Sequence, residues 1–297
     1  MKNILVIGSA NIDLTIHTER MPKLGETVTG HGFSMNSGGK GANQAVAAAK
    51  LGGEVKFLGV IGNDTYGEKL LADLRKSGVA FEGITTDGVP TGTACITVVN
   101  GDNFIVLNPG ANDLLTPEII EETAELIRKS DYVIMQLEIP VDSVLRAAVI
   151  AKDAGTSVVL NPAPVKELPD EIYRLTDIMI PNEYEAMLLT GISTDNEQGC
   201  RAAVEDLRKK GVKTAIITLG DRGCVYNDGD RIIFHPAGKA DVVDTTSAGD
   251  SFIGALCCKL ASGNSLPESV DYATKVAAVT VSRRGASESI PYAHEIK

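Results

Sequence analysis

Short runs of consecutive apolar residues alternate with segments of helical periodicity along most of the chain. Continuous apolar runs are typical of parallel strands buried on both faces, and regular strand–helix alternation favours helices on both sides of such a sheet. The pattern therefore predicts a three-layer α/β/α fold with a mostly parallel central sheet. The predicted strands are residues 3–8, 55–61, 132–137, 157–160, 178–180 and 214–219, and the predicted helices are residues 45–51, 67–76, 117–129, 142–154, 199–210, 252–260 and 265–283.

Two regions depart from this alternation and carry short strand-like segments. In the first, Pro22 and Gly25 separate segments that have no helical period. In the second, two apolar strands flank Gly101-Asp102, a pair typical of hairpin turns. We expect both regions to form one small β-sheet lid over a pocket; the alternative is that the hairpin extends the main sheet. The predicted lid is residues 11–35 and 91–107, and the predicted large domain is residues 1–10, 36–90 and 108–297.

Composition narrows the partners that the chain can have. The 297 residues carry a formal net charge of −11, which disfavours nucleic acid and an anionic membrane surface as partners. The five cysteines are odd in number and include no Cys-x-x-C pair, which is typical of a reduced, cytoplasmic protein without a disulfide framework or a zinc site. We expect no secretory signal and no membrane-spanning segment.

The segment 244–250 combines small residues, acids and a helix start. Ser247, Ala248 and Gly249 lie where an apolar helix begins, so their backbone N–H groups and the helix dipole predict an anion site. A carboxylate beside such a site repels an anion unless it has another task. We infer that Asp250 accepts the proton of a hydroxyl that attacks a phosphate, since phosphoryl transfer needs a carboxylate to orient the nucleophile. The alternative is that Asp250 is only the N-cap of the helix.

Further polar residues follow predicted strands at their carboxyl ends, where open α/β sheets place their ligands. Asn11 and Asp13 come after the first strand. On an extended segment their side chains point to the same side and can hold neighbouring hydroxyls of a small polyol. Ordinary turn chemistry is the alternative for this pair. Glu138 lies at the same edge of the sheet, after the strand 132–137.

Residues 36–44 form a glycine-rich segment that leads into a helix. The glycines let a ligand approach the backbone, although helix packing alone also explains them. The segment is not a Walker A loop, because Gly41 follows Lys40 where Ser or Thr is needed. Asn43, one turn into the helix, can face the same pocket as Asp13.

Two more segments at strand ends suit a nucleotide. Asn182 and Glu185 are three residues apart at a helix start, so both can face a site for phosphate and hydrated Mg²⁺. A capping box fits the same pair equally well. The glycine turn 220–223 lets a nucleotide lie close to the backbone. All candidate residues lie at a strand's carboxyl end or in the following helix start, which predicts a single cleft along one edge of the sheet.

Four motifs in consistent order resemble the ribokinase-type carbohydrate kinases, or PfkB family, over about residues 3–293. Two positions depart from the family pattern: Ser247 stands where glycine or alanine is usual, and Thr274 stands where many relatives have asparagine or another adenine-contacting residue. The motifs are Gly-Lys-Gly-Ala-Asn at 39–43, Asn-x-x-Glu at 182–185, Thr-Leu-Gly-Asp-Arg-Gly at 218–223 and Asp-Thr-Thr-Ser-Ala-Gly-Asp at 244–250. The segments most similar to ribose-specific members are Asn-x-Asp at 11–13, Gly-Gly-Lys-Gly-Ala-Asn-Gln-Ala at 38–45, Gln-Leu-Glu at 136–138 and Asn-Pro-Ala-Pro at 161–164.

The resemblance implies an ATP- and Mg²⁺-dependent kinase that phosphorylates the 5-hydroxyl of D-ribose. It implies that Asp250 is the catalytic base and that the amides of Ser247, Ala248, Gly249 and Asp250 form the anion hole. The sugar-binding residues that it implies are Asn11, Asp13, Gly39, Lys40, Gly41, Ala42, Asn43, Glu138 and Asp250. The nucleotide-binding residues that it implies are Asn182, Thr218, Leu219, Gly220, Asp221, Arg222, Gly223, Gly249, Asp250 and Thr274.

The resemblance also implies an activating monovalent cation, K⁺, beside the anion hole, and Mg²⁺ held by Glu185 through water. Asp244 alone has independent support as a cation ligand, because it is acidic and lies in a turn with spare carbonyls; a simple turn role is the alternative. The implied K⁺ ligands are the side chains of Asp244 and Ser289 and the backbone carbonyls of Thr246, Thr280, Arg283 and Gly285.

Small molecules, sugar and ATP, are the expected ligands, and a homodimer through the lid is expected because exposed strand edges need covering and relatives pair their lids. Two other activities stay open. The first is a kinase for another furanose, such as 2-deoxyribose or fructose, or for a nucleoside. The second is a non-catalytic sugar or nucleotide sensor on the same fold.

Overall fold

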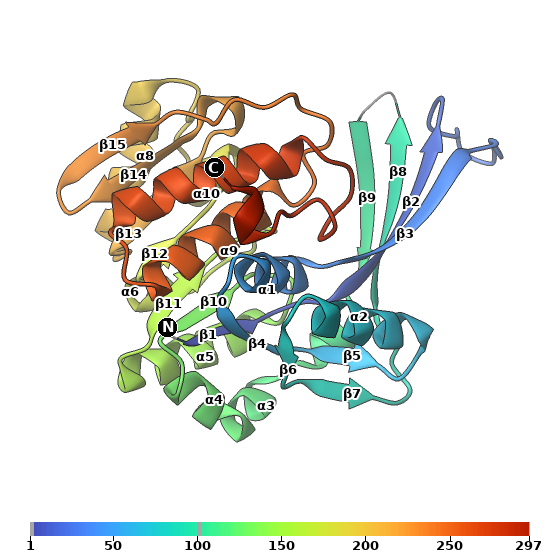
Figure 1. The fold of residues 1–297 in the computed structure, drawn as a ribbon, viewed down its shortest axis with the longest axis horizontal. Helices are drawn as coiled ribbons and strands as arrows, with labels where there is room; N and C mark the ends of the chain where they lie inside the picture. Colours follow the sequence, from blue (N-terminus) through green and yellow to red (C-terminus); the bar gives the residue numbers. More distant parts are fainter. Residues whose placement is uncertain (1–2, 100–101, 297) are drawn as a thin grey trace.

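A computed structural model describes residues 3–99 and 102–296 (Figure 1). A nine-stranded sheet forms its centre, in the order β15-β14-β13-β12-β11-β10-β1-β4-β6. The strands from β13 to β6 are parallel, and β14 and β15 are added antiparallel at one edge. The strands are β1 (Asn3–Ile7), β4 (Glu54–Leu58), β6 (Ala80–Phe81), β10 (Tyr132–Met135), β11 (Ser157–Leu160), β12 (Ile178–Met179), β13 (Thr214–Thr218), β14 (Cys224–Asp228) and β15 (Arg231–His235).

Helices cover both faces of this sheet. Alternate residues of β1 pack into different apolar cores, Leu5 and Ile7 into one and Ile4 and Val6 into the other, which is why the strand is apolar throughout. The expected α/β/α fold is therefore confirmed. The helices of the first core are α3 (Pro117–Glu122), α4 (Ala124–Arg128), α5 (Val141–Ala154), α6 (Asp170–Leu175), α7 (Glu183–Thr190) and α8 (Glu197–Lys210), and those of the second are α1 (Lys40–Lys50), α2 (Thr65–Lys76), α9 (Ala248–Ala261) and α10 (Leu266–Val281).

A second, four-stranded sheet projects from the side of the main body (Figure 1). Its order is β3-β2-β8-β9, and β2 and β8 are its one parallel pair. The predicted hairpin thus belongs to the small sheet, and the alternative that it extends the main sheet is wrong. Gly101, in the expected turn, lies outside the described residues. The strands are β2 (Asn11–Thr18), β3 (His31–Gly38), β8 (Gly92–Val99) and β9 (Asp102–Asn108).

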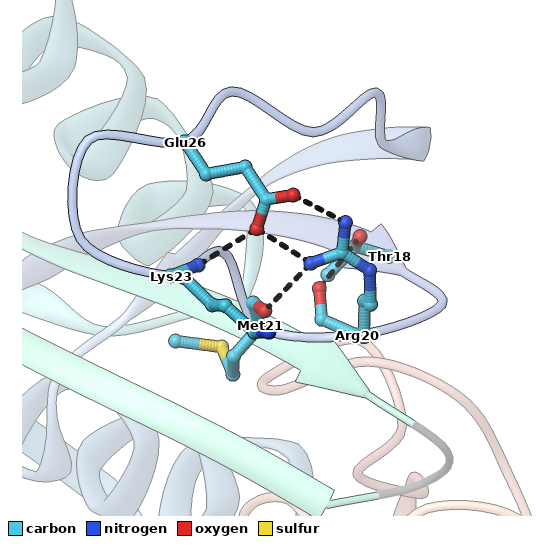
Figure 2. Close-up of polar contacts among 5 residues, drawn as sticks. All are labelled: Thr18, Arg20, Met21, Lys23 and Glu26. Carbon is cyan, nitrogen blue, oxygen red and sulfur yellow. Dashed lines mark hydrogen bonds and ion pairs between the residues drawn. The ribbon is translucent and has the colours of Figure 1, made fainter.

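An ion pair organises the connection between β2 and β3, at the end of the small sheet away from the main body (Figure 2). Both terminal nitrogens of Arg20 donate to the Glu26 carboxylate, at 2.6 and 2.5 Å, and the backbone N–H of Lys23 donates to it at 2.9 Å. These donors, Arg20 first, lower the pKa of Glu26 to about 2. The connection is therefore ordered by its own polar contacts, while Leu24 within it is fully exposed.

The predicted strand 55–61 is divided in the structure at Gly59. Its first part is β4, and its second part, β5 (Val60–Gly62), pairs with β7 (Ile84–Thr86) in a separate two-stranded sheet. A Cβ at Gly59 would lie 2.8 Å from Gly8 O, so only glycine lets the chain pass this close to the end of β1. The expectation of one continuous strand was wrong because an apolar run does not show where a chain changes sheets.

The predicted helix 117–129 is also divided, into α3 and α4, at Thr123. The Thr123 hydroxyl donates to Ile119 O at 2.7 Å, a side-chain bond that competes with the helical backbone pattern. Within the described residues, no helix has both the length and the apolarity needed to cross a membrane.

Candidate active site

Asp250 lies in the first turn of α9, and its buried carboxylate contacts α1. Ser247 is the N-cap of α9, so the alternative that Asp250 is only the N-cap is wrong. Asn43 Nδ2 donates to Asp250 Oδ2 at 3.1 Å, and Gln44 Nε2 donates to Oδ1 at 3.0 Å. Burial raises the pKa of Asp250, while the charge of Lys40 and the two amide donors oppose this rise.

The turn before α9 leaves several backbone donors without a partner. Ser247 has a φ of 60°, the only positive φ of a non-glycine among the described residues, and a Cβ at Gly249 would meet no atom within 4 Å. No acceptor among the described residues pairs with the N–H groups of Ser247, Gly249 and Asp250. The N–H of Ala248, however, donates to Thr245 O at 3.2 Å. The expectation that Ala248 offers a bare amide was therefore wrong, because the turn uses that donor internally.

A cavity of about 870 Å³ opens beside this turn. Leu219 and Arg222, both expected in the nucleotide site, do not line it. Leu219 is packed in a core, and Arg222 forms an ion pair with Glu183 and donates to Thr194 O at 2.9 Å. The predicted nucleotide-binding residues that do line the cavity are Asn182, Thr218, Gly220, Asp221, Gly223, Gly249, Asp250 and Thr274, and Lys40, Glu185, Ser247 and Ala248 line it as well.

One wall of the cavity consists of small apolar residues that the sequence analysis missed: Ala237, Gly238, Ala277 and Ala278. A Cβ at Gly238 would lie 2.7 Å from the Ala278 side chain, so the segment after β15 packs closely on α10. A wall without bulky side chains suits a flat aromatic ring. Scattered alanines and glycines give no sequence signal for such a role.

Asn182 and Glu185 form a capping box and also face the cavity. The Asn182 N–H donates to Glu185 Oε2 and the Glu185 N–H to Asn182 Oδ1, each at 2.8 Å, so the capping box is present. Both residues also line the cavity. Burial raises the pKa of Glu185, and the Asn182 N–H and the Lys40 charge oppose the rise.

Asn11 and Asp13 lie on strand β2, so the turn alternative for this pair is wrong. Their side chains share one face of the small sheet and rest over glycines of the neighbouring strands. A Cβ at Gly38 would lie 2.2 Å from Asp13 Oδ2, and one at Gly92 would lie 2.2 Å from Asn11 Oδ1. Glycine is therefore required at both positions for the two polar groups to occupy their places.

A buried side chain that the sequence analysis missed, Asn112, fixes the orientation of Asn11. Asn112 Nδ2 donates to Asn11 Oδ1 at 2.7 Å and to Pro109 O at 2.9 Å, while its Oδ1 accepts from the Ala10 N–H at 2.9 Å. Because the Asn11 oxygen is taken, its amide nitrogen is the group that can donate to a ligand. No motif marks Asn112 in the sequence.

Glu138 follows β10, and its carboxylate is hydrogen-bonded to the start of α1. Its Oε2 accepts from the Ser9 hydroxyl at 2.5 Å and from the Lys40 backbone N–H at 3.0 Å. The glycines of this helix start also serve packing: a Cβ at Gly39 would lie 2.8 Å from Asn11 N, and one at Gly41 would lie 2.6 Å from Ser9 N. Ala42, which follows them, is buried, and its N–H donates to Ser9 O at 2.9 Å.

Carboxylates crowd around a single ammonium group in the site. Burial alone would lower the pKa of Lys40, but Asp250, Glu138, Glu185 and Asp13 together raise it. Burial, followed by the charges of Glu138 and Asp250, raises the pKa of Asp13 to about 7, with Lys40 opposing. The carboxylates expected for the sugar and the phosphate are thus brought into one electrostatic cluster.

The candidate cation ligands lie behind the turn before α9. Asp244 Oδ1 accepts from the Thr246 N–H at 2.9 Å and Oδ2 from the Gly285 N–H at 3.1 Å, which joins the turn to the segment after α10. These bonds lower the pKa of Asp244 although burial opposes them. Of the other candidates, Thr280 O accepts from the Arg283 N–H at 3.1 Å, and the Ser289 hydroxyl donates to Ala286 O at 2.7 Å. The Arg283 side chain forms an ion pair with Glu295.

Comparison with known proteins places the chain in a family. The model of the pfkB family carbohydrate kinases matches residues 1–293. A ribokinase of Haemophilus influenzae is 40% identical over 301 residues, which cover 99% of this chain and 97% of that protein. A bifunctional ribokinase/ribose-5-phosphate isomerase A of Fructilactobacillus sanfranciscensis is 40% identical over 295 residues, but this chain spans only 55% of that protein's length.

Two other relatives are a protein named for a different sugar and a ribokinase solved with its ligands. A deoxyribokinase of Salmonella typhi is 36% identical over 294 residues, covering 97% of this chain and 95% of that protein. The structure of an Arabidopsis thaliana ribokinase complexed with ribose and ATP superimposes with a TM-score of 0.93 at 34% identity, covering 99% of this chain and 96% of that one.

The raised pKa of Asp13 predicts that this residue destabilises the free protein at high pH. Its carboxyl is neutral below about pH 7 and must carry its charge in a buried, negative site above that pH. We expect Asp13→Asn to be more stable than the wild type at pH 8, by roughly 1–3 kcal/mol. The difference should shrink as the pH falls below about 7 and vanish only near pH 4, where the carboxyl is also protonated in the unfolded chain. Urea unfolding at the two pH values, without ligand, measures this.

Asp64→Asn is the matched control for this prediction. Asp64 caps α2 and accepts from the Gly67 and Thr91 N–H groups; although burial opposes it, these bonds lower its pKa, so its charge stabilises the fold once the pH exceeds the unfolded value. The same substitution should therefore destabilise the protein at pH 8. An Asp13→Asn variant that is no more stable than the wild type at pH 8 would contradict the assignment.

Proposed function

The chain belongs to the pfkB family of carbohydrate kinases, and we propose that it is a ribokinase, which transfers the γ-phosphoryl group of ATP to O5 of D-ribose. The observation that carries the proposal is the place of Asp250. Its buried carboxylate lines the large cavity. It is also close enough to Asp13 for its negative charge to help raise the pKa of that residue. A carboxylate in this place can take the proton from a sugar hydroxyl that attacks a phosphate bound at the turn before α9.

In the proposed reaction, the O5 hydroxyl gives its proton to Asp250 as O5 bonds to the γ-phosphorus. The bond from that phosphorus to the bridging oxygen breaks, and the electron pair leaves with ADP. The free N–H groups of Ser247, Gly249 and Asp250 and the Lys40 ammonium stabilise the negative charge on the transferring group. Asn11, through its amide nitrogen, Asp13 and Asn43 bind the sugar together with Glu138, and Gly39, Gly41 and Ala42 shape the site around it.

The large cavity provides the ATP site. The adenine would lie on the small apolar wall at Ala277 and Ala278, with the phosphates toward Asn182 and the Gly249 amide. Mg²⁺ fits Glu185, a buried carboxylate that lines the cavity, and because Glu185 also serves the capping box it would hold the ion through water. When bound, Mg²⁺ neutralises phosphate charge.

A monovalent cation, K⁺, is proposed beside the anion hole. Asp244 already joins the turn at Thr246 to Gly285, and its lowered pKa keeps it charged. Carboxylate and carbonyl oxygens are a suitable donor set for such an ion, with Thr280, Arg283 and Ser289 as the remaining candidates. When bound, the cation would add positive potential behind the turn that holds the phosphate.

We further propose that the small sheet is a lid and that two lids pair in a homodimer. Its strands carry exposed apolar side chains on the face opposite to Asp13, as the register of β2, β3, β8 and β9 shows. Water-exposed apolar residues gathered on one face favour burial against a second copy. They are Ile16, Phe33, Met35, Phe104 and Val106.

The cysteines suit a reducing compartment. Among the described residues all are free thiols; Cys95 is exposed, and the others are buried. We therefore propose that the protein works in the cytoplasm, where thiols stay reduced.

The deoxyribokinase relative makes 2-deoxyribose the second candidate substrate. Fructose and nucleosides stay open as well. Phe104, the one aromatic side chain of the 93–107 hairpin, lies on the face opposite to Asp13, which disfavours stacking of a base in the site. A non-catalytic sensor is disfavoured because such a protein has no need of the Asp250 carboxylate.

The proposed substrate is tested with ATP and a panel of ribose, 2-deoxyribose, fructose and nucleosides. We expect ribose to be preferred over 2-deoxyribose by at least about tenfold in kcat/KM, because a site that hydrogen-bonds the 2-hydroxyl leaves polar groups unpaired without it. Asn11→Ala should narrow this ratio. Equal turnover of the two sugars would contradict the choice of ribose.

The same assay tests the cation. Replacing K⁺ by tetramethylammonium should lower wild-type turnover several-fold, and Asp244→Asn should remove the response. Turnover that is independent of K⁺ would contradict this site without affecting the sugar assignment.

The base assignment predicts a large loss of turnover in Asp250→Asn, which keeps the shape of the side chain but removes the proton acceptor. We expect kcat to fall by about 10²–10⁴-fold, with little change in ribose binding, in steady-state assays of ADP release and in calorimetry. Asp153→Asn, at an exposed site at the end of α5, is the control and should behave as the wild type. Near-normal turnover of Asp250→Asn would refute the assignment.

The lid interface predicts that Val106→Glu converts a dimer into a monomer in light scattering, because it places a charge on the exposed apolar face. Ile105→Glu is the matched control, since Ile105 is exposed on the opposite face of the same strand and should leave the dimer intact. A wild type that is monomeric at micromolar concentration would contradict the proposal.

A further inference from the structure

Three buried side-chain amides form a chain behind Asp250 that the reaction described above does not use. Gln44 comes from α1, Gln136 follows β10 and Asn161 follows β11; at most 7% of each is exposed. Each lies in one of the segments that most resemble the ribose-specific family members. Their convergence on one carboxylate calls for a physical explanation.

A backbone carbonyl sets the direction of every hydrogen bond in this chain. Ile180 O can only accept, so Asn161 must present its Nδ2, which lies 2.9 Å away. The Asn161 oxygen then faces Gln44, which must present Nε2, at 3.2 Å. The Gln44 oxygen in turn accepts from Gln136 Nε2 at 2.6 Å.

The result of this order is that Gln44 always offers N–H to the base. The same Nε2 that donates to Asn161 lies 3.0 Å from Asp250 Oδ1. With Gln44 flipped, its oxygen would face both Asp250 Oδ1 and Asn161 Oδ1, so acceptors would meet acceptors at two contacts. The row of hydrogen-bonded amides therefore allows Gln44 only the orientation that favours a charged Asp250.

At the far end of this row of amides, Gln136 is held by packing and not by a second hydrogen bond within the described residues. Gln136 Oε1 is buried without a partner among the described residues, and a Cβ at Gly8 would lie 2.0 Å from it. A group left without a hydrogen bond in the interior costs stability. Gln136 thus keeps a costly orientation in order to donate to Gln44, and Gly8 leaves the room for it.

Asn43 cannot perform the same task alone. Its Nδ2 is shared between Asp250 Oδ2 and the Ser247 hydroxyl, at 3.1 Å each, but its Oδ1 is buried without a partner among the described residues, so no second contact fixes the direction of this amide. Gln44 does not line the large cavity, whereas Asn161 does.

We propose that Gln44 is the positioning residue of the catalytic base: locked by Asn161 and Gln136, it holds Asp250 Oδ1 by a one-way hydrogen bond and fixes the rotation and charge of the carboxylate. The inference rests on the proposed kinase function. It assigns the amides of three motifs to one task, which is to keep Asp250 ready to receive the proton from O5.

Gln44→Met and Gln44→Glu test the contact. Both remove the donor, and Glu adds a like charge, so the acid limb of the kcat–pH profile should move to higher pH, further for Glu than for Met. At neutral pH we expect kcat to fall by about 10–100-fold while KM for ribose stays within about threefold. A merely structural role would lower thermal stability without moving the pH profile.

Asn161→Leu tests the locking. It leaves Gln44 beside Asp250 but removes one of its two locks, so we expect a shift of the pH profile in the same direction with a smaller loss of kcat. Because Asn161 also lines the large cavity, KM for ATP is measured alongside. In the double variant with Gln44→Met, Asn161→Leu should add no further loss of kcat, since Asn161 acts through Gln44. Should Gln44→Met fail to fold, Gln44→Glu and Asn161→Leu still give the pH profile.

Asn227→Leu is the control for loss of a buried amide. Asn227 is 1% exposed on β14 and bonds Ala215 N and Lys213 O, at 2.8 and 3.0 Å, so its loss should lower the melting temperature and leave the kcat–pH profile unchanged. Unshifted profiles in the Gln44 variants, or additive losses in the double variant, would overturn the inference while the wild type still phosphorylates ribose. A wild type with no kinase activity would instead overturn the proposed function.

Discussion

The close contact between helices α1 and α9 determines where the polar groups of the site lie. Gly254 of α9 rests directly on α1, where a Cβ would lie 2.5 Å from Ala47 Cβ and 2.8 Å from Ala48 N. Only this small separation lets Asn43 and Gln44, side chains of one helix, reach a carboxylate in the first turn of the other. Packing of small residues is therefore the condition for the polar chemistry, because a larger residue at 254 would separate the acid from its donors.

The electrostatic design of the site opposes the stability of the free protein. Asp13, Glu185 and Asp250 all have raised pKa values, and Lys40 is the cation that they share. A group that needs a ligand to complete its hydrogen bonds or balance its charge is expensive to bury without it. The structure limits this cost with fixed donors, which are the amides of Asn43 and Gln44 at Asp250 and the reciprocal capping bonds at Glu185.

The sequence predicted the architecture well because the period of apolar residues reports burial directly. It also placed the candidate residues at one sheet edge, since strand polarity follows from the alternation of strands and helices. It did not predict the division at Gly59, where a continuous apolar run enters a different sheet, or the role of Asn112, whose partners are about a hundred residues away. It also did not find Gln44 as a donor to Asp250, because the direction of an amide depends on contacts from three separate segments. Local patterns carry burial and backbone geometry, while such contacts exist only in the folded chain.

Two of the sugar-binding candidates, Asn11 and Asp13, are part of the small sheet. Strand β2 begins at Asn11 and Asp13 and continues into the projecting sheet, while Asn43 and Asp250 belong to the main body (Figure 1). Asn112 bonds both Ala10 and Asn11, so the start of β2 is anchored where the two parts join. A rotation of the sheet about this anchor would move Asp13, two residues further along the strand, more than Asn11. In the proposed kinase, the sugar would lie between a fixed acid, Asp250, and a movable one, Asp13. Closure of the proposed lid would then also align the hydroxyl with Asp250.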